Sequence, residues 1–307
     1  MTDEAQMTLE LRERSASHSG LHADQRLAIE PHLRSVQDHY RETIDDYRQW
    51  SPEGNLHFGY WRWGLNPLRR SVMLAEMNRQ VFQSLGLHSL SEGTIADLGC
   101  GVGAVSRLGS ELYPQLNFRA MNISTRQIAE ARQMTHHDRV QYDCADYHRL
   151  GWPTASIDGA FFMESLCYSL SPEKVIAEVA RVLRPGARLV VTDGYLQRPL
   201  EDTSKFFRWV FRRVSANWAV PAYHSIQAAD DWAKASGLRL LEKRDLSWRL
   251  APSAVQSVPM TLYCAIKLGL HGERSSWRWR QLAASALALT LGLQRHNFRY
   301  YLLTFQK

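Results

Sequence analysis

Hydrophobic and polar positions follow two alternating periods through the middle of the chain. Short apolar runs, such as "TIADL" at 94–98 and "IDGAFFM" at 157–163, alternate with segments such as "PEKVIAEVARVL" at 172–183, whose apolar residues recur every three or four positions. The runs predict buried strands and the wider spacing predicts amphipathic helices. From 94 to 194 this rhythm predicts an α/β fold with a doubly wound, Rossmann-like and mostly parallel sheet.

The segments on either side of this region have a different pattern. Residues 1 to about 35 are polar without a period, and a helical pattern follows to 85, broken by "SPEGNLHFGYWRWGLNP" at 51–67. We therefore expect an N-terminal helical and lid segment over 1–85 and a core over 86–307. Helical cap insertions are expected at about 195–224 and 249–296. Strands are also expected at 187–193 and 238–248, with a final strand at 298–306.

Composition narrows the class of protein. The chain has 307 residues, 37 basic and 31 acidic side chains and a net charge of +6, with the basic residues scattered. This balance slightly favours an anionic small substrate or a membrane surface over nucleic acid. The four cysteines have no metal-binding spacing, and neither a secretory signal nor an 18-residue apolar span is visible. We expect a cytoplasmic protein with no resident metal.

The stretch "ADLGCGVG" at 96–103 follows the first predicted strand and reads as a ligand-binding turn. Gly99, Gly101 and Ala104 also fit the dinucleotide fingerprint, so NAD is one candidate ligand. Two features oppose it: Asp97 lies at the mouth of the strand, where a carboxylate suits an ammonium group, and Asn122 stands where an acid would meet a ribose. A ligand with an amino-acid end fits better.

With "RVLRPGARLVVTD" at 181–193, this stretch resembles the motifs of class I methyltransferases, which use S-adenosylmethionine. "NISTRQIAEAR" at 122–132 resembles the sterol and tocopherol methyltransferase branch, and "ESLCYS" at 164–169 resembles enzymes that methylate isoprenoid diphosphates. The resemblance implies that S-adenosylmethionine binds through these residues: Asp97, Gly99, Gly101, Gly103, Asn122, Gln127, Asp146, Tyr147, Tyr60 and Trp61. Asn122 departs from the Asp or Glu of many relatives. Gln127 and Asp146 each have a structural interpretation as well. Gln127 forms a capping box with Ser124, and Asp146 suits a turn.

The same resemblance implies an acceptor chemistry. Glu164 would deprotonate the carbocation left when an alkene takes the methyl group, with Tyr168 beside it and His57 facing the substrate. Tyr60, Trp61 and Tyr168 would stabilise positive charge through their ring faces. Alternatively, Glu164 anchors loop N–H groups, and the aromatic residues hold the lid segment against the core.

A basic helix is predicted after the fifth strand. Lys205, Arg208 and Arg212 share one of its faces, which suits the anionic head of a lipophilic substrate such as a prenyl diphosphate, although such faces are commonly only solvated. A diphosphate would bring Mg²⁺ with it. A peripheral membrane contact and an oligomer are further expectations, and a nucleic-acid partner is not expected.

We therefore predict a methyltransferase that acts on a lipophilic small molecule, with C-methylation of an isoprenoid alkene as the leading reaction. The alternative within the class is O-methylation of a natural product, quinone or sugar, with His57 or Tyr168 managing the proton. Three functions other than small-molecule methylation stay open from the sequence: an RNA methyltransferase, a non-catalytic sensor of S-adenosylmethionine and a dehydrogenase.

Overall fold

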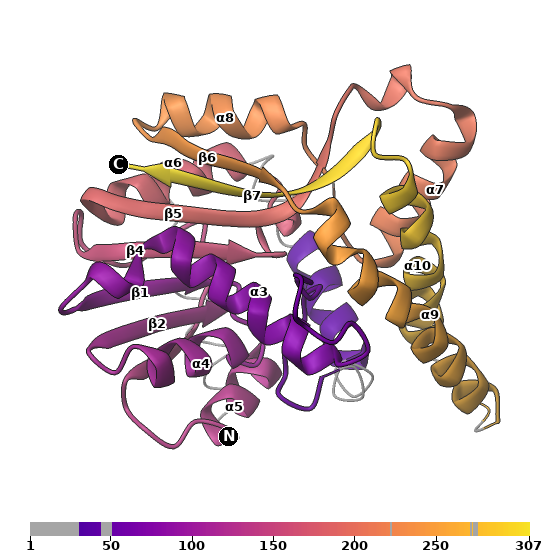
Figure 1. Cartoon of the computed structure of the whole chain (residues 1–307), viewed down its shortest axis with the longest axis horizontal. Coiled ribbons are helices and arrows are strands. Elements are labelled where there is room, and N and C mark those ends of the chain that lie inside the picture. The colour runs from indigo at the N-terminus through magenta and orange to yellow at the C-terminus, as the bar shows by residue number, and fades with distance from the viewer. Residues whose placement is uncertain (1–30, 44–50, 222, 271, 273–275) are drawn as a thin grey trace.

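The computed structural model describes residues 31–43, 51–221, 223–270, 272 and 276–307, and these contain one mixed sheet (Figure 1). Its strands are β1 (Gly93–Leu98), β2 (Leu116–Asn122), β3 (Val140–Cys144), β4 (Ile157–Met163), β5 (Leu183–Leu196), β6 (Arg239–Asp245) and β7 (Phe298–Gln306). Their order is β3-β2-β1-β4-β5-β7-β6; the first five pair in parallel and β7 is antiparallel to both its neighbours. The predicted doubly wound sheet is confirmed.

Helices cover both faces of the sheet, as the apolar strands require. β4 is buried along nearly its whole length, as expected of a parallel strand with helices on both sides. One face packs against α3 (Arg70–Leu85), α4 (Ala104–Leu112) and α5 (Thr125–Gln133), the other against α6 (Pro172–Val182) and α8 (Ile226–Ala235) (Figure 1). The carboxyl ends of the central strands stay uncovered by these layers, and the site lies there.

Three element boundaries differ from the sequence expectation. A helix already spans 31–43, inside a stretch expected to lack regular structure until about residue 35, while 1–30 lie outside the described residues. β5 is longer than the expected 187–193. The strand expected over 238–248 ends at Asp245, because the Asp245 carboxylate accepts the N–H of Ser247 at 2.9 Å and α9 (Ser247–Leu270) starts there.

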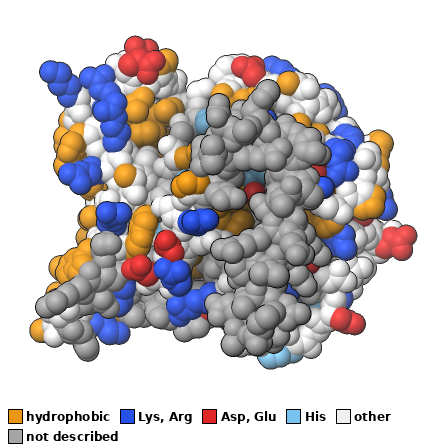
Figure 2. Space-filling view, turned by 180° about the vertical axis from the view of Figure 1, so that it is seen from behind, with side chains coloured by type: hydrophobic (Ala, Val, Ile, Leu, Met, Phe, Trp, Pro, Cys, Tyr) orange, Lys and Arg blue, Asp and Glu red, His pale blue; other side chains and the backbone are white. Residues whose placement is uncertain are grey.

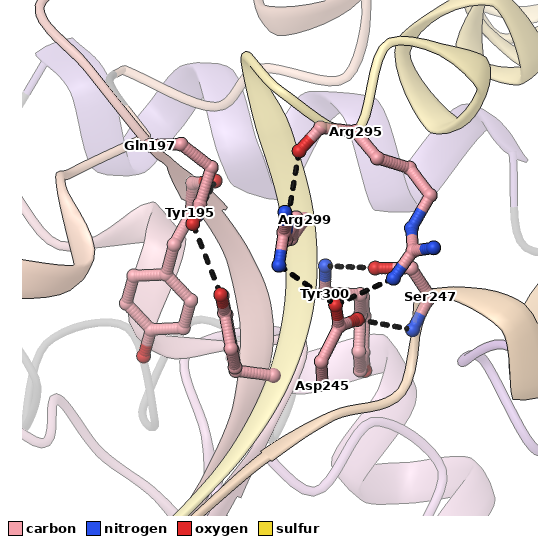
Figure 3. Close-up of polar contacts among 8 residues, drawn as sticks. Tyr195, Gln197, Asp245, Ser247, Arg295, Arg299 and Tyr300 are labelled. Carbon is pink, nitrogen blue, oxygen red and sulfur yellow. Dashed lines mark hydrogen bonds and ion pairs between the residues drawn. The ribbon is translucent and has the colours of Figure 1, made fainter.

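Helix α9, α10 (Ser276–Leu293) and α7 (Lys205–Asn217) lie together at one end of the sheet (Figure 1). Figure 3 shows how the base of the α9–α10 pair is fastened: Asp245 Oδ2 accepts from Arg295 at 2.6 Å and from Arg299 at 3.3 Å. Burial alone would raise the pKa of Asp245, but hydrogen bonds from Ser247 and Arg295 outweigh it, so the pKa is lowered. Within the described part of the chain, no helix is long and apolar enough to cross a bilayer.

Candidate cofactor and active site

A cavity opens where β1, β2 and β4 end, with about 850 Å³ of space including the solvent at its mouth. The glycine-rich turn, the start of α5, the loop after β4, the segment 54–57 and the helix over 31–43 surround it. The lining residues are Leu33, Val36, Tyr40, Gly54, Asn55, Leu56, His57, Asp97, Gly99, Cys100, Gly101, Ala104, Val105, Asn122, Ile123, Gln127, Asp146, Tyr147, Met163, Glu164, Ser165 and Tyr168. Residues far apart in sequence thus meet at one site.

The charge of this lining is one-sided. Three carboxylates, Asp97, Asp146 and Glu164, face the cavity, and the described lining contains no Lys or Arg. A low-dielectric pocket with acidic groups alone attracts a cation and repels an anionic pyrophosphate. The cavity therefore suits a ligand with ammonium and sulfonium charges better than a dinucleotide.

The turn after β1 requires glycine at positions 99 and 103, where φ is positive and a side chain would clash. Gly99 has φ +92°, and a Cβ there would lie 2.4 Å from the Cβ of Ser165. Gly103 has φ +77°, and its Cβ would lie 2.3 Å from the Tyr142 hydroxyl. Gly99 and Gly101 line the cavity, whereas Gly103 lies beneath it and lets Tyr142 pack under the turn.

Asp97 is buried at the end of β1. One carboxylate oxygen accepts the Ser106 hydroxyl at 2.6 Å, and burial raises the pKa of Asp97 to about 7 despite that hydrogen bond. A cation arriving in the cavity would offset the cost of ionising this buried group. Asp97 is thus placed to hold an ammonium group.

Asn122 and Gln127 form a pair at the end of β2. Asn122 Nδ2 donates to Gln127 Oε1 at 2.7 Å, and Asn122 Oδ1 accepts the N–H of Ser124 at 3.2 Å. Ser124 caps α5 by accepting the Gln127 N–H, so one half of the capping box forms. The Gln127 side chain instead faces Asn122, and its buried Nε2 has no hydrogen-bond partner among the described residues. That nitrogen is available to a ligand.

Asp146 and Tyr147, which follow β3, also line the cavity. Asp146 Oδ1 accepts the backbone N–H of His148 at 2.9 Å and lies 2.6 Å from His148 Nδ1, while Nε2 of that ring lies 2.8 Å from the Ser169 hydroxyl. Tyr147 donates to the carbonyl of Ser165 at 3.0 Å. Asp146 therefore both forms a turn and faces the cavity, so its predicted roles in a turn and in cofactor binding are compatible.

Glu164 occupies a strained position at the end of β4. Its φ of +51° is in the left-handed region, uncommon for a residue with a side chain. Oε1 accepts the Phe58 N–H and the Tyr300 hydroxyl, each at 2.9 Å. Burial raises the pKa of Glu164 to about 7, although both hydrogen bonds and the charge of Arg70 act to lower it. Glu164 thus anchors the lid segment and also faces the cavity.

The lid segment presents different residues from those expected. His57 lines the cavity, is buried and has its pKa lowered to about 4 by desolvation. Its ring nitrogens lie 2.9 Å from the Phe58 carbonyl and 3.2 Å from Asn55 Oδ1. Tyr60 and Trp61 are not in the described lining: Tyr60 packs in the core, and Trp61 donates to the Leu65 carbonyl. The Tyr60 ring therefore holds the segment against the core, whereas the Trp61 ring bonds within the segment itself.

Three tyrosines give the cavity lining an aromatic character. Tyr168 lines the cavity beside Tyr40 from the helix over 31–43, with ring centroids 5.9 Å apart and hydroxyls 3.0 Å apart. Tyr147 is the third. Sequence reasoning missed Tyr40 and Tyr300. Tyr300 lies in an apolar strand whose pattern signals only core, and Tyr40 precedes the glycine-rich stretch at 96–103 by more than fifty residues.

The basic helix α7 does not contribute to this cavity. Lys205 and Arg212 are exposed, and Arg208 donates to the Glu201 carbonyl at 2.6 Å. None of the three lines the cavity, so their predicted contact with a substrate head group has no support from this geometry. Across the described residues, no group of three His, Cys, Asp or Glu side chains is placed to hold a metal ion.

Buried carboxylates make the stability of the cofactor-free protein depend on pH. The folded-state pKa values of Asp97 and Glu164 are both raised to about 7 by burial. Each group therefore stabilises the fold fully below its unfolded pKa, near 4, and loses that contribution as pH rises through about 7. His39 and His57 oppose this below about pH 6.5, because their lowered pKa values make stability rise with pH there.

We expect Asp97→Asn/Glu164→Gln to separate these opposing contributions. The free energy of unfolding of the double variant, relative to wild type, should rise by about 2 kcal/mol or more from pH 5 to pH 8. Urea unfolding of cofactor-free protein at several pH values measures this, with the buried Glu76→Gln as a control for loss of a carboxyl group. A difference that stays flat with pH would show that the two carboxyl groups titrate normally.

Comparison with known proteins agrees with this geometry. Residues 96–191 match the family described as "Methyltransferase domain". A methyltransferase, GfsG, of Streptomyces halstedii is 27% identical over 79% of this chain and 86% of its own length. The O-methyltransferase cnsE of Penicillium expansum is 28% identical over 73% of this chain and 79% of its own length. The 2-methyl-6-phytyl-1,4-hydroquinone methyltransferase of a Synechocystis strain is 28% identical over 62% of this chain and 64% of its own length.

Solved structures share the fold. The cyclopropane synthase MmaA2 of Mycobacterium tuberculosis superposes with a TM-score of 0.75 at 15% identity, covering 90% of this chain and 99% of its own. Geranyl diphosphate C-methyltransferase of Streptomyces coelicolor A3(2) superposes with a TM-score of 0.68 at 14% identity, covering 90% of this chain and 97% of its own. That structure was solved with Mg²⁺, geranyl diphosphate and S-adenosyl-L-homocysteine. The resemblance to class I methyltransferases expected from the sequence is confirmed.

Proposed function

We propose that this chain, whose residues 96–191 match the methyltransferase-domain family, transfers a methyl group from S-adenosylmethionine to an alkene carbon of a lipophilic isoprenoid. When bound, this cofactor supplies an electrophilic methyl group on a sulfonium. The cavity at the carboxyl ends of β1, β2 and β4 is the proposed site for donor and acceptor together.

The observation that carries the proposal is the position of Glu164 in a cavity lined by acids. Its carboxylate accepts hydrogen bonds from Phe58 of the lid segment and from Tyr300, which fix its position. Its strained backbone conformation is the kind of cost that persists at functional sites. A raised pKa of about 7 lets the same group take a proton at neutral pH.

The reaction needs one base and a surface that tolerates positive charge. The alkene electron pair forms the new bond to the methyl carbon as S-adenosylhomocysteine leaves, and a cation remains on the neighbouring alkene carbon. Glu164 removes a proton beside that cation, and the C–H electrons restore a double bond. The rings of Tyr40, Tyr147 and Tyr168 line the space in which this cation would form.

The lining also bears on the acceptor. Since the described lining contains no Lys or Arg, nothing there neutralises a diphosphate. We therefore favour a neutral isoprenoid. A prenyl diphosphate would have to enter with its own Mg²⁺.

O-methylation of a phenolic or quinol natural product is the second candidate. Tyr168 and the neutral His57 line the cavity, and a match to an O-methyltransferase accompanies this geometry. Both nitrogens of His57 already face loop groups, which makes Tyr168 the better placed of the two to relay a proton.

The test is mass spectrometry of purified protein with S-adenosylmethionine and a panel of acceptors, with and without Mg²⁺. Sterols, quinones, phenols, neutral isoprenoids, and geranyl and farnesyl diphosphates form the panel. A product heavier by one methyl group on carbon, together with S-adenosylhomocysteine, supports the proposal. Methylation on oxygen alone would replace it with the second candidate, and cofactor binding without any product would indicate a sensor.

Tyr300 gives a prediction that separates positioning from structure. We expect Tyr300→Phe to raise the pKa of Glu164, because the hydroxyl that stabilises its ionised form is lost. The pH profile of kcat should shift to higher pH, and turnover at pH 7 should fall about tenfold and recover at higher pH. Tyr301→Phe, which loses a hydroxyl bonded to Gln197 instead, is the matched control. An unshifted profile in Tyr300→Phe would contradict the role.

A further inference from the structure

The three helices at the end of the sheet have an unusual charge composition. Helices α7, α9 and α10 contain no Asp or Glu. Their eight basic residues are Lys205, Arg208, Arg212, Arg213, Arg249, Lys267, Arg278 and Arg280. This part of the molecule therefore carries much of the excess positive charge, although the chain as a whole is only +6.

Helix α9 is apolar on its outer side as well as its inner side. Its inner face buries Ser253, Ser257, Cys264 and Leu268. The opposite face exposes large apolar residues at helical spacing: Val255, Val258, Leu262, Ile266 and Leu270. Leu262 is 61% exposed and Ile266 is 55% exposed. Such a stripe on a helix favours contact with another apolar phase.

Helix α7 combines exposed aromatic and basic residues. Phe206 and Trp209 stack with centroids 6.5 Å apart, and both are more than half exposed. Lys205 and Arg212 are exposed on the same helix. Exposed aromatic rings beside cations are typical of helices that lie at the boundary between lipid and water.

These helices form one layer. Helix α10 contacts both α7 and α9, and all three lie at the same end of the sheet (Figure 1). From behind, hydrophobic and basic side chains appear together along the corresponding edge, on the left of Figure 2, with a small group of acidic side chains at its upper end. We call the exposed side of this layer, marked by Lys205, Phe206, Trp209, Arg212, Leu262 and Ile266, the α7–α9 surface.

We infer that the α7–α9 surface docks on an anionic phospholipid membrane. The apolar stripe would enter the headgroup boundary and the cations would lie against lipid phosphates. Charge complementarity selects this occupant over a second copy of the chain, because two such surfaces facing each other would bring cations together without an acid on these helices. This goes beyond the proposed reaction, since it concerns a surface that does not line the cavity.

Co-sedimentation of the full chain with vesicles tests this inference. We expect binding to vesicles that contain phosphatidylglycerol, weak binding to pure phosphatidylcholine and a decrease in binding as salt rises. Leu262→Glu should weaken the partition coefficient about tenfold or more, and Arg212→Ala/Arg213→Ala about fivefold per charge. The matched controls are Leu112→Glu, at an exposed apolar site on α4, and Arg239→Ala/Lys243→Ala on β6.

Two results would overturn the inference. One is equal binding of wild type and Leu262→Glu to anionic vesicles. The other is a dimer, measured by light scattering without lipid, that Leu262→Glu dissociates, because a second copy would then occupy the surface. Affinity for S-adenosylmethionine should stay unchanged in Leu262→Glu, so a failure here is distinguishable from a failure of the proposed reaction.

Discussion

Replacing Glu164 with Gln should lower turnover by about 10² to 10⁴-fold while cofactor affinity changes little. Gln keeps an Oε1 that accepts the Phe58 N–H and the Tyr300 hydroxyl, so the lid segment stays anchored. It cannot take a proton from carbon. Single-turnover rates with the acceptor found by mass spectrometry, alongside calorimetric cofactor affinity, measure the two effects separately.

The control for this substitution is Glu76→Gln. Glu76 is also buried, bonded to Arg62 and Gln80, and outside the cavity lining, so it reports the general effect of losing a buried carboxylate. If the folded Glu164→Gln variant kept full turnover, Glu164 would not be the catalytic base. Glu164 would then serve only to anchor the loop, and O-methylation would become the leading function.

Replacing Asp97 with Asn should weaken cofactor binding by about 30-fold or more, which corresponds to about 2 kcal/mol. The buried carboxylate is placed to balance an ammonium charge, and the neutral amide cannot do so. The same change should leave the cofactor-free protein as stable as wild type or more stable above pH 7, because an uncompensated buried charge is removed. Calorimetric titration and thermal unfolding measure the two quantities.

Asp193→Asn is the matched control for Asp97→Asn. Asp193 is equally buried, with its pKa raised to about 6, but it accepts from Cys167 and Gly194 N–H groups and does not line the cavity. Its replacement should change stability without a comparable loss of affinity. If both variants lost affinity equally, the effect of Asp97 would be structural.

Local sequence patterns predicted the parts of the site that follow strand ends. Asp97 lies one residue before the end of β1, Asn122 ends β2 and Glu164 directly follows β4. Parallel strands bring their carboxyl ends to one edge of the sheet, so these three residues meet there. The pattern of apolar residues predicted all seven strands of the described sheet, and the central ones most directly, because a strand between two helical layers is apolar along its length.

The sequence by itself determined the doubly wound sheet, the glycine-rich turn and the acids at its edge, because these depend on short-range periodicity and on backbone conformations that only certain residues adopt. Tertiary structure alone decided which side chains turn toward the cavity. It placed Tyr300 against Glu164 across 136 positions and left the basic face of α7 outside the cavity. It also directed Tyr60 into the core and Trp61 into a hydrogen bond within the lid segment. Side-chain direction in a loop or cap depends on contacts with distant elements, and no local period encodes those contacts.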